Sequence, residues 1–207
     1  MSRAWVCKGL LWRLLAALLF CVPAPGLAQE PEVAAVSLRA VEEGLVLDAD
    51  FAFDLSPRLV DVLRNGVPLY FVVEFELTRD RWYWLDERAA SAQLQMRVSY
   101  HALSRQYRLS SGALQQNFAS LDEALSVLKH VRSWLVVDRT VTFSDADYDA
   151  RVRLRLDTAL LPKPFQLSAL TGRDLHLETP WKRFIVHSPQ QLPAPVETRE
   201  TQGREAR

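Results

Sequence analysis

The arginines at positions 151, 153 and 155 form the charge pattern in this chain that is best suited to binding or pairing. The positions between and beside them are apolar: Ala150, Val152, Leu154 and Leu156. A β-strand turns successive side chains to opposite faces, so the pattern predicts a strand that projects three guanidinium groups from one face, about 7 Å apart. Such a row can hold a phosphate or carboxylate ligand bidentately.

The same arginine row can instead pair with carboxylates on a neighbouring strand. Two sets of acidic residues lie on the polar faces of other predicted strands: Glu74 and Glu76, or Asp48, Asp50 and Asp54. We favour cross-strand pairing over ligand binding for the arginine row, and both sets of carboxylates remain candidate partners.

An aromatic and basic cluster follows one of the predicted strands. Its aromatic members are Trp82, Tyr83 and Trp84, and the arginines nearby are Arg79, Arg81 and Arg88. If exposed, such a cluster can bind a partner protein, a glycan or a membrane surface; if buried, it forms one wall of the core. We take Arg81 and the three aromatic residues, together with the arginine row, as the candidate partner or ligand surface.

Metal and cofactor chemistry finds little support in the sequence. Asp145, Asp147 and Asp149 have the spacing that begins a calcium loop, but the glycine and glutamate that an EF-hand requires later are replaced by Ala150 and Leu156. The histidines have no metal-ligand spacing among themselves: His101, His130, His176 and His187. We therefore predict no metal and no cofactor.

Catalytic motifs are equally scarce. The chain contains no G-x-S-x-G elbow and no glycine-rich phosphate loop. We predict no catalytic residue and expect a non-enzymatic protein. An enzyme of unrecognised type that uses His101 and nearby acids is kept as a third hypothesis.

Alternation of apolar and polar residues is the dominant secondary-structure signal, and it must position these groups. It predicts strands over residues 34–41, 45–55, 67–78, 94–100, 103–109, 113–118, 150–156 and 181–186. The strand over 67–78 could continue to residue 85 after a bulge near 79–80, and residues 86–91 are polar and turn-like. Strands with one polar face indicate an antiparallel sheet that is solvated on one side.

Two short helices interrupt the strands. Ser56-Pro57 predicts the start of a helix over about 56–65, which Asn65-Gly66 ends. Ser120 and Glu123 form a capping box that begins a second helix over about 121–132. The predicted fold class is α+β: a mainly antiparallel β-sheet, or a small sandwich, with two short helices.

Residues 1–28 have the features of a secretory signal peptide. Arg3, Lys8 and Arg13 precede and enter a short apolar run, and Gly26-Leu27-Ala28 supplies the small residues that a signal peptidase needs. Cleavage after Ala28 would remove both cysteines of the chain. Retention of the segment as a membrane anchor is the alternative, although an apolar run interrupted by Arg13 is short for a spanning helix.

The remaining chain predicts one domain and a tail. Residues 29–187 are long enough for a single domain with its own core, and residues 188–207 form a polar, proline-containing run that we expect to be disordered. Three of the 25 basic residues and none of the 25 acidic ones precede Gln29, so the predicted mature protein is slightly acidic. This charge indicates no nucleic-acid partner. Membrane contact is expected only through a retained signal segment.

Four segments together resemble a bacterial exported family, the DUF4390 domain of unknown function: VEFEL at 73–77, RWYWLD at 81–86, YHALSRQYR at 100–108 and SLDEAL at 120–125. The resemblance covers most of the chain from Val36 to Val186. It implies a proteobacterial envelope setting and an accessory role in envelope signalling beside a membrane sensor kinase. It brings no catalytic residues.

These observations lead to an expected location and function. We expect a periplasmic or secreted protein that acts as a non-enzymatic binding or accessory module, with an envelope protein such as a sensor kinase as its partner. The alternative is a carrier of a small apolar or amphipathic ligand held between the sheet and the helices.

Overall fold

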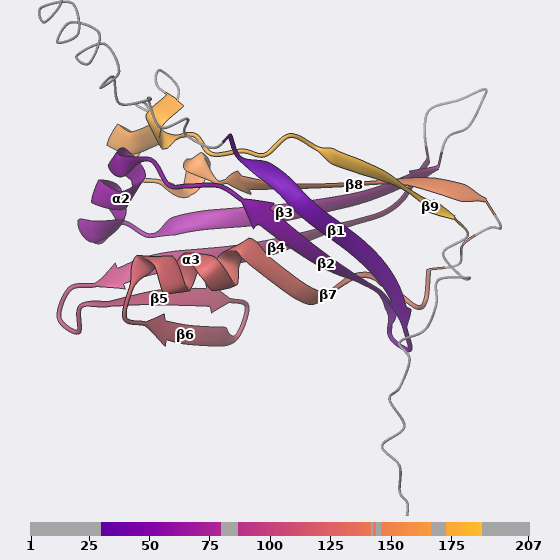
Figure 1. Ribbon diagram of the computed structural model, residues 1–207, viewed down its shortest axis with the longest axis horizontal. Helices are drawn as coiled ribbons and strands as arrows, with labels where there is room; N and C mark the ends of the chain where they lie inside the picture. The colour runs from indigo at the N-terminus through magenta and orange to yellow at the C-terminus, as the bar shows by residue number, and fades with distance from the viewer. Residues whose placement is uncertain (1–29, 80–86, 142, 144–145, 167–172, 188–207) are drawn as a thin grey trace, which may run out of the picture.

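Two antiparallel sheets, described by a computed structural model, make up the fold (Figure 1). The structure describes residues 30–79, 87–141, 143, 146–166 and 173–187. The three-stranded sheet has the spatial order β1 (Glu32–Val41), β2 (Gly44–Ala52) and β7 (His130–Asp138). The six-stranded sheet has the order β6 (Leu114–Phe118), β5 (Gln106–Ser111), β4 (Glu87–His101), β3 (Leu69–Arg79), β8 (Asp147–Leu156) and β9 (Lys182–His187).

Alternation along the central strands gives the six-stranded sheet one apolar and one polar face. On β3, five side chains on one face are fully buried: Leu69, Phe71, Val73, Phe75 and Leu77. The apolar side chains of β8 that the sequence singled out are buried on the same face: Ala150, Val152, Leu154 and Leu156. Burial of these side chains is the main stabilisation that the sheet receives.

The apolar face of the six-stranded sheet packs against the three-stranded sheet. Leu47 and Ala49 of β2, and Phe53 directly after it, are buried in the same core cluster as the apolar face of β3. The rings of Phe53 and Phe71 stack with their centroids 6.1 Å apart. Figure 1 shows β1 and β2 crossing in front of β3 and β8, and this arrangement is a small sandwich.

Two short helices extend the layer formed by the three-stranded sheet. Helix α2 (Pro57–Arg64) begins at Ser56, whose hydroxyl accepts from the Leu59 N–H at 3.2 Å. Helix α3 (Leu121–Lys129) begins at Ser120, whose hydroxyl accepts from the Glu123 N–H at 3.2 Å. Helix α3 lies along β5 and β6 beside β7 (Figure 1). The opposite, polar face of the six-stranded sheet has no helix packed on it among the described residues.

Two 3₁₀ turns, η1 (Thr158–Leu160) and η2 (Arg173–Leu175), follow β8. The hydroxyl of Ser56, at the start of α2, donates to the carbonyl oxygen of Asp174 in η2. No helix in the described part of the chain has the length and hydropathy that crossing a membrane requires.

The predicted fold class is confirmed, and three local predictions are wrong. The strand predicted over residues 103–109 begins only at Gln106, because residues 102–105 form the turn after β4, in which Arg105 has a φ of 53°. The second helix ends at Lys129 and not near residue 132, because β7 starts directly at His130. The polar residues after Asp86 do not form a turn, since β4 begins at Glu87 and pairs with the end of β3.

Candidate functional site

The polar face of the six-stranded sheet carries a ladder of ion pairs between β3 and β8. The strand register places Arg151 opposite Glu76 and Arg153 opposite Glu74, with Arg155 opposite Val72. Directly opposite residues of an antiparallel pair point to the same face. The arginine row therefore meets Glu74 and Glu76, which was one of the two pairings expected from the sequence.

Glu74 is the centre of this ladder. One carboxylate oxygen accepts from Arg153 Nε at 2.6 Å, and the other accepts from Arg155 Nε at 3.0 Å and from the Gln93 amide at 3.5 Å. The residue is buried, at 8 % exposure, on a face that is otherwise solvated. Burial raises the pKa of Glu74, but the hydrogen bonds from Arg153 and Arg155 outweigh it and hold the pKa below its ordinary value.

The ladder continues onto the segment that leads into β9. Arg153 also forms an ion pair with Glu178. The backbone of Glu178 pairs with that of Arg155 in an isolated antiparallel β-bridge. The ring of Trp181 lies beneath two guanidinium groups, with centroid distances of 4.8 Å to Arg151 and 4.4 Å to Arg153. Arginines held at one end by carboxylates and along one side by an aromatic ring lose most of their freedom to reorient.

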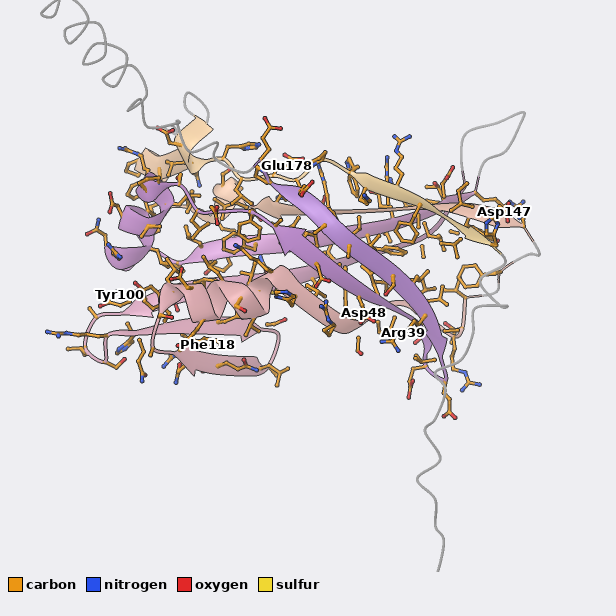
Figure 2. The ribbon with its side chains drawn as sticks, viewed as in Figure 1. Arg39, Asp48, Tyr100, Phe118, Asp147 and Glu178 are labelled. Atoms are coloured by element: carbon orange, nitrogen blue, oxygen red, sulfur yellow. The ribbon has the colours of Figure 1, made fainter. Side chains whose placement is uncertain are left out.

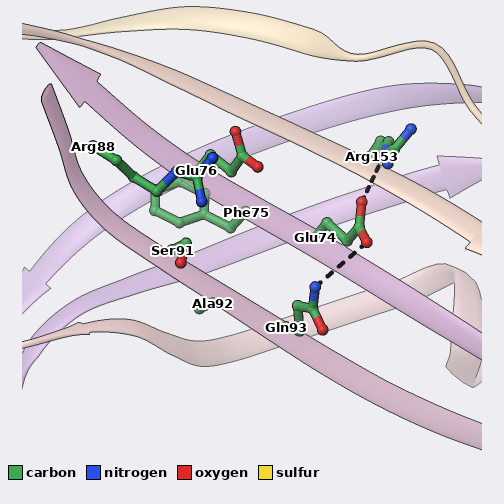
Figure 3. Close-up of a pocket in the computed structure, with 8 residues that line it drawn as sticks. All are labelled: Glu74, Phe75, Glu76, Arg88, Ser91, Ala92, Gln93 and Arg153. Carbon is green, nitrogen blue, oxygen red and sulfur yellow. Dashed lines mark hydrogen bonds and ion pairs between the residues drawn. The ribbon is translucent and has the colours of Figure 1, made fainter. Parts of the chain in front are cut away.

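A polar pocket of about 260 Å³ opens beside the ladder, over β3, β4 and β8. Its polar lining consists of Glu74, Glu76, Arg88, Ser91, Gln93 and Arg153. Figure 3 shows Glu74 between Arg153 and Gln93, with Arg88 and Ser91 on the neighbouring strand. The pocket thus offers hydrogen-bonding groups and charges of both signs, which suits a polar ligand or the polar side chains of a partner.

The electrostatics of this site favour recognition over proton transfer. Both oxygens of Glu74 accept from donors, and its lowered pKa keeps it ionised near neutral pH. A general acid or base needs a pKa near the working pH. Within the described ranges, no three or more His, Cys, Asp or Glu side chains are grouped closely enough to hold a metal ion.

A second charged cluster lies on the outer face of the three-stranded sheet. Arg39 of β1 donates through Nε to Asp48 of β2 at 3.0 Å, and Figure 2 shows the two side chains next to each other. Asp48 also accepts the backbone N–H of Ser133 at 2.7 Å. Arg132 pairs with Asp50. The aspartates that were the other candidate partners of the arginine row therefore have partners of their own.

The structure places the remaining predicted residues as follows. Arg81, Trp82, Tyr83, Trp84 and Asp145 lie outside the described residues, so the exposure of the aromatic cluster stays a prediction. Asp147 lies on β8, where its carboxylate is 2.9 Å from Nδ1 of His187 on β9. His130 caps the end of α3, with Nδ1 at 2.6 Å from the Ser126 carbonyl oxygen.

Sequence reasoning missed the roles of Gln93, Glu178 and Trp181 at the ladder. Gln93 directly precedes the predicted strand over 94–100 and continues its polar face, and it lies opposite Glu74 in the register, so strand pairing would have located it. Glu178 lies in an irregular segment, and no periodic pattern points to its contact with Arg153.

The protein is therefore an α+β sandwich domain. The outer face of its larger sheet carries a row of buried and half-buried ion pairs. The family model for the domain of unknown function DUF4390 matches residues 28–185, and the chain belongs to this family. No curated protein and no solved structure matches the chain.

Proposed function

We propose that the protein is an exported, non-enzymatic binding module of the bacterial cell envelope that recognises a partner protein through the polar face of its six-stranded sheet. The observation that carries this proposal is the Glu74 cluster, which consists of Glu74, Arg153, Arg155 and Glu178. A carboxylate fixed by Arg153 and Arg155 is poorly suited to proton transfer, yet it holds charged groups in a defined pattern at the surface. Preorganised groups of this kind lower the entropic cost of binding.

The neighbouring pocket supports the same proposal. Arg88 is exposed beside the pocket, and it makes no ion pair with another described residue. A carboxylate from a partner can therefore bind Arg88 without breaking the Glu74 cluster. Trp82 and Trp84, which follow β3 in the sequence, belong to the proposed surface on sequence grounds.

The proposed location rests on the N-terminal sequence and on the family resemblance. Cell fractionation and N-terminal sequencing test it directly. We expect the protein in the periplasmic fraction with a mature start at Gln29. A cytoplasmic protein that retains residue 1 would overturn the export proposal.

The partner is tested with a photo-crosslinking amino acid in place of Ser91, which is exposed and lines the same pocket, in cells that express the full chain. We expect a crosslink to the periplasmic part of a membrane protein, with a sensor kinase as the proposed class. The Trp82→Ala/Trp84→Ala variant should reduce the crosslink, and a crosslinker at exposed Asn65, directly after α2, is the control. Equal crosslinking from positions 65 and 91 would argue against the proposed surface.

The alternative expected from the sequence is a carrier of a small apolar or amphipathic ligand. The polar lining of the pocket beside Glu74 does not favour this alternative. Native mass spectrometry of protein isolated from cells tests it, since a carrier would retain a bound small molecule.

A further inference from the structure

The polar face of the six-stranded sheet is divided into two halves of different charge. The half formed by β3 and β8 contains the ion-pair ladder. The half formed by β4, β5 and β6 contains no carboxylate after Glu87, because the chain has no acidic residue from Arg88 to Leu121. Its charged groups are arginines alone, among Ser, Gln and Asn side chains.

The arginines of this half lack acidic partners within the described part of the chain. Arg97 is exposed, and Arg108 donates to the neutral Oδ1 of Asn117 at 3.0 Å. The register pairs Arg97 with Ser110 and Arg108 with Ser99, so the two arginines are diagonal neighbours on one face. Arg105, in the turn between β4 and β5, adds a third positive charge near the same end.

The turn between β4 and β5 also exposes an apolar side chain. Leu103 is 94 % exposed, the highest value among the large hydrophobic residues of the described chain. It projects from the end of the hairpin that carries Arg105 and Arg108. A soluble anionic polymer would satisfy the arginines but would leave Leu103 in water, whereas a lipid bilayer offers anionic headgroups and an apolar layer beneath them.

We infer that the β4–β5 hairpin docks the protein onto a membrane surface that contains anionic phospholipids. Leu103 enters the headgroup region, and Arg105, Arg108 and Arg97 contact lipid phosphates. This contact adds to any that the N-terminal segment makes, and it differs from our expectation that only that segment would touch a membrane. It does not depend on the protein partner proposed above.

Flotation with lipid vesicles tests this inference. The full chain is expressed in cells, and the protein is purified with whatever N-terminus the cells produce. It is mixed with vesicles of pure phosphatidylcholine or with vesicles of phosphatidylcholine and phosphatidylglycerol in equal parts. We expect stronger flotation with the anionic vesicles, reduced by added salt. The Arg105→Gln/Arg108→Gln variant should bind more weakly by about fivefold per arginine, and Leu103→Ser should also weaken binding.

Matched controls come from exposed residues elsewhere. Arg139→Gln removes an exposed arginine after β7, and Ile185→Ser removes an apolar side chain of β9 that is 60 % exposed. Both controls should float like the unchanged protein. Equal losses in the control and hairpin variants would overturn the inference. So would losses confined to the arginine variant, with Leu103→Ser unchanged, because a soluble polyanion would then be the better ligand.

Discussion

The carboxylate of Asp48 accepts the backbone N–H of Ser133 at 2.7 Å, and Ser133 has a φ of 49°. Left-handed backbone is uncommon for a residue other than glycine and costs about 1 kcal/mol or more. The Asp48 carboxylate, itself bound to Arg39, offsets part of this cost. The contact joins β2 to β7 close to a point where their register shifts, between Leu47 and Ala49.

We expect Asp48→Asn to lower the free energy of unfolding by about 1–2 kcal/mol, because it weakens the bonds to Ser133 and Arg39. Urea denaturation of the purified protein measures this change. Asp54→Asn is the control: its side chain is 79 % exposed and, among the described residues, pairs only with Lys129 at 3.5 Å. The control should change stability by less than about 0.5 kcal/mol. Equal effects of the two substitutions would contradict the prediction.

The effect of a substitution at Ser133 on stability should depend on the backbone conformation that the new residue prefers more than on its polarity. Ser133→Val places a β-branched side chain at positive φ and should destabilise the protein by about 1–2 kcal/mol. Ser133→Gly should be close to neutral or stabilising, since glycine adopts this conformation without strain. Thermal unfolding of the two variants compares them, and a valine variant as stable as the glycine variant would show that the left-handed conformation is not required.

Stability should fall in acid through Glu74. Its pKa is below the ordinary value of 4.5, so the unfolded chain binds a proton at a higher pH than the folded protein does. The stabilisation is therefore complete above about pH 4.5 and is lost as the pH falls through the folded-state pKa. Urea unfolding between neutral pH and about pH 3 measures this loss.

The variant Glu74→Gln should lose about 2 kcal/mol at neutral pH, because it leaves Arg153 and Arg155 with fewer acceptors. Its stability should also decline less steeply in acid than that of the unchanged protein. Glu76→Gln is the matched control, since Arg151 is the one ion-pair partner of Glu76 in the described ranges and Glu76 is more exposed than Glu74, so its loss should be smaller. An identical acid profile for the protein with and without Glu74 would refute this assignment.

Gly44, at the start of β2, should not tolerate any side chain. It has a φ of 146°, and a Cβ atom there would lie 2.0 Å from the Val137 carbonyl oxygen of β7. We expect Gly44→Ala to cost more than about 2 kcal/mol. Gly112→Ala, in the turn between β5 and β6, meets no atom within 4 Å and should cost only about 1 kcal/mol for its φ of 55°. The difference between their urea midpoints checks this prediction.

The sequence predicted the central strands and the arginine row because both depend on the alternation of apolar and polar residues. Residues 150–156 alternate without interruption, and residues 67–78 do so except at Val72. Pairing of polar faces still left two sets of carboxylates as candidate partners of the arginine row, and the strand register decides for Glu74 and Glu76. The helix starts at Ser56 and Ser120 were equally readable, because each cap is a local hydrogen bond between a hydroxyl and the N–H three residues later.

Strand β7 could not be predicted in the same way. Its register with β2 shifts at two places, and Ser133 adopts a positive φ, so its apolar residues do not alternate regularly. Val131 instead continues the apolar stripe of α3, which extended the predicted helix beyond Lys129. The contacts of Glu178 and Trp181 with the arginine row could not be predicted for another reason. They depend on the path by which an irregular segment returns to the edge of β8.

The Glu74 cluster also constrains how sequences in this family can diverge. Arg153 binds Glu74 and Glu178 and stacks on Trp181, so a change at any of these positions removes at least one contact of the cluster. Relatives that lose Glu74 should therefore have replaced Arg153 and Arg155 as well, and positions 74, 153, 155 and 178 should covary. Arg88, which no described residue holds in an ion pair, should vary independently of them.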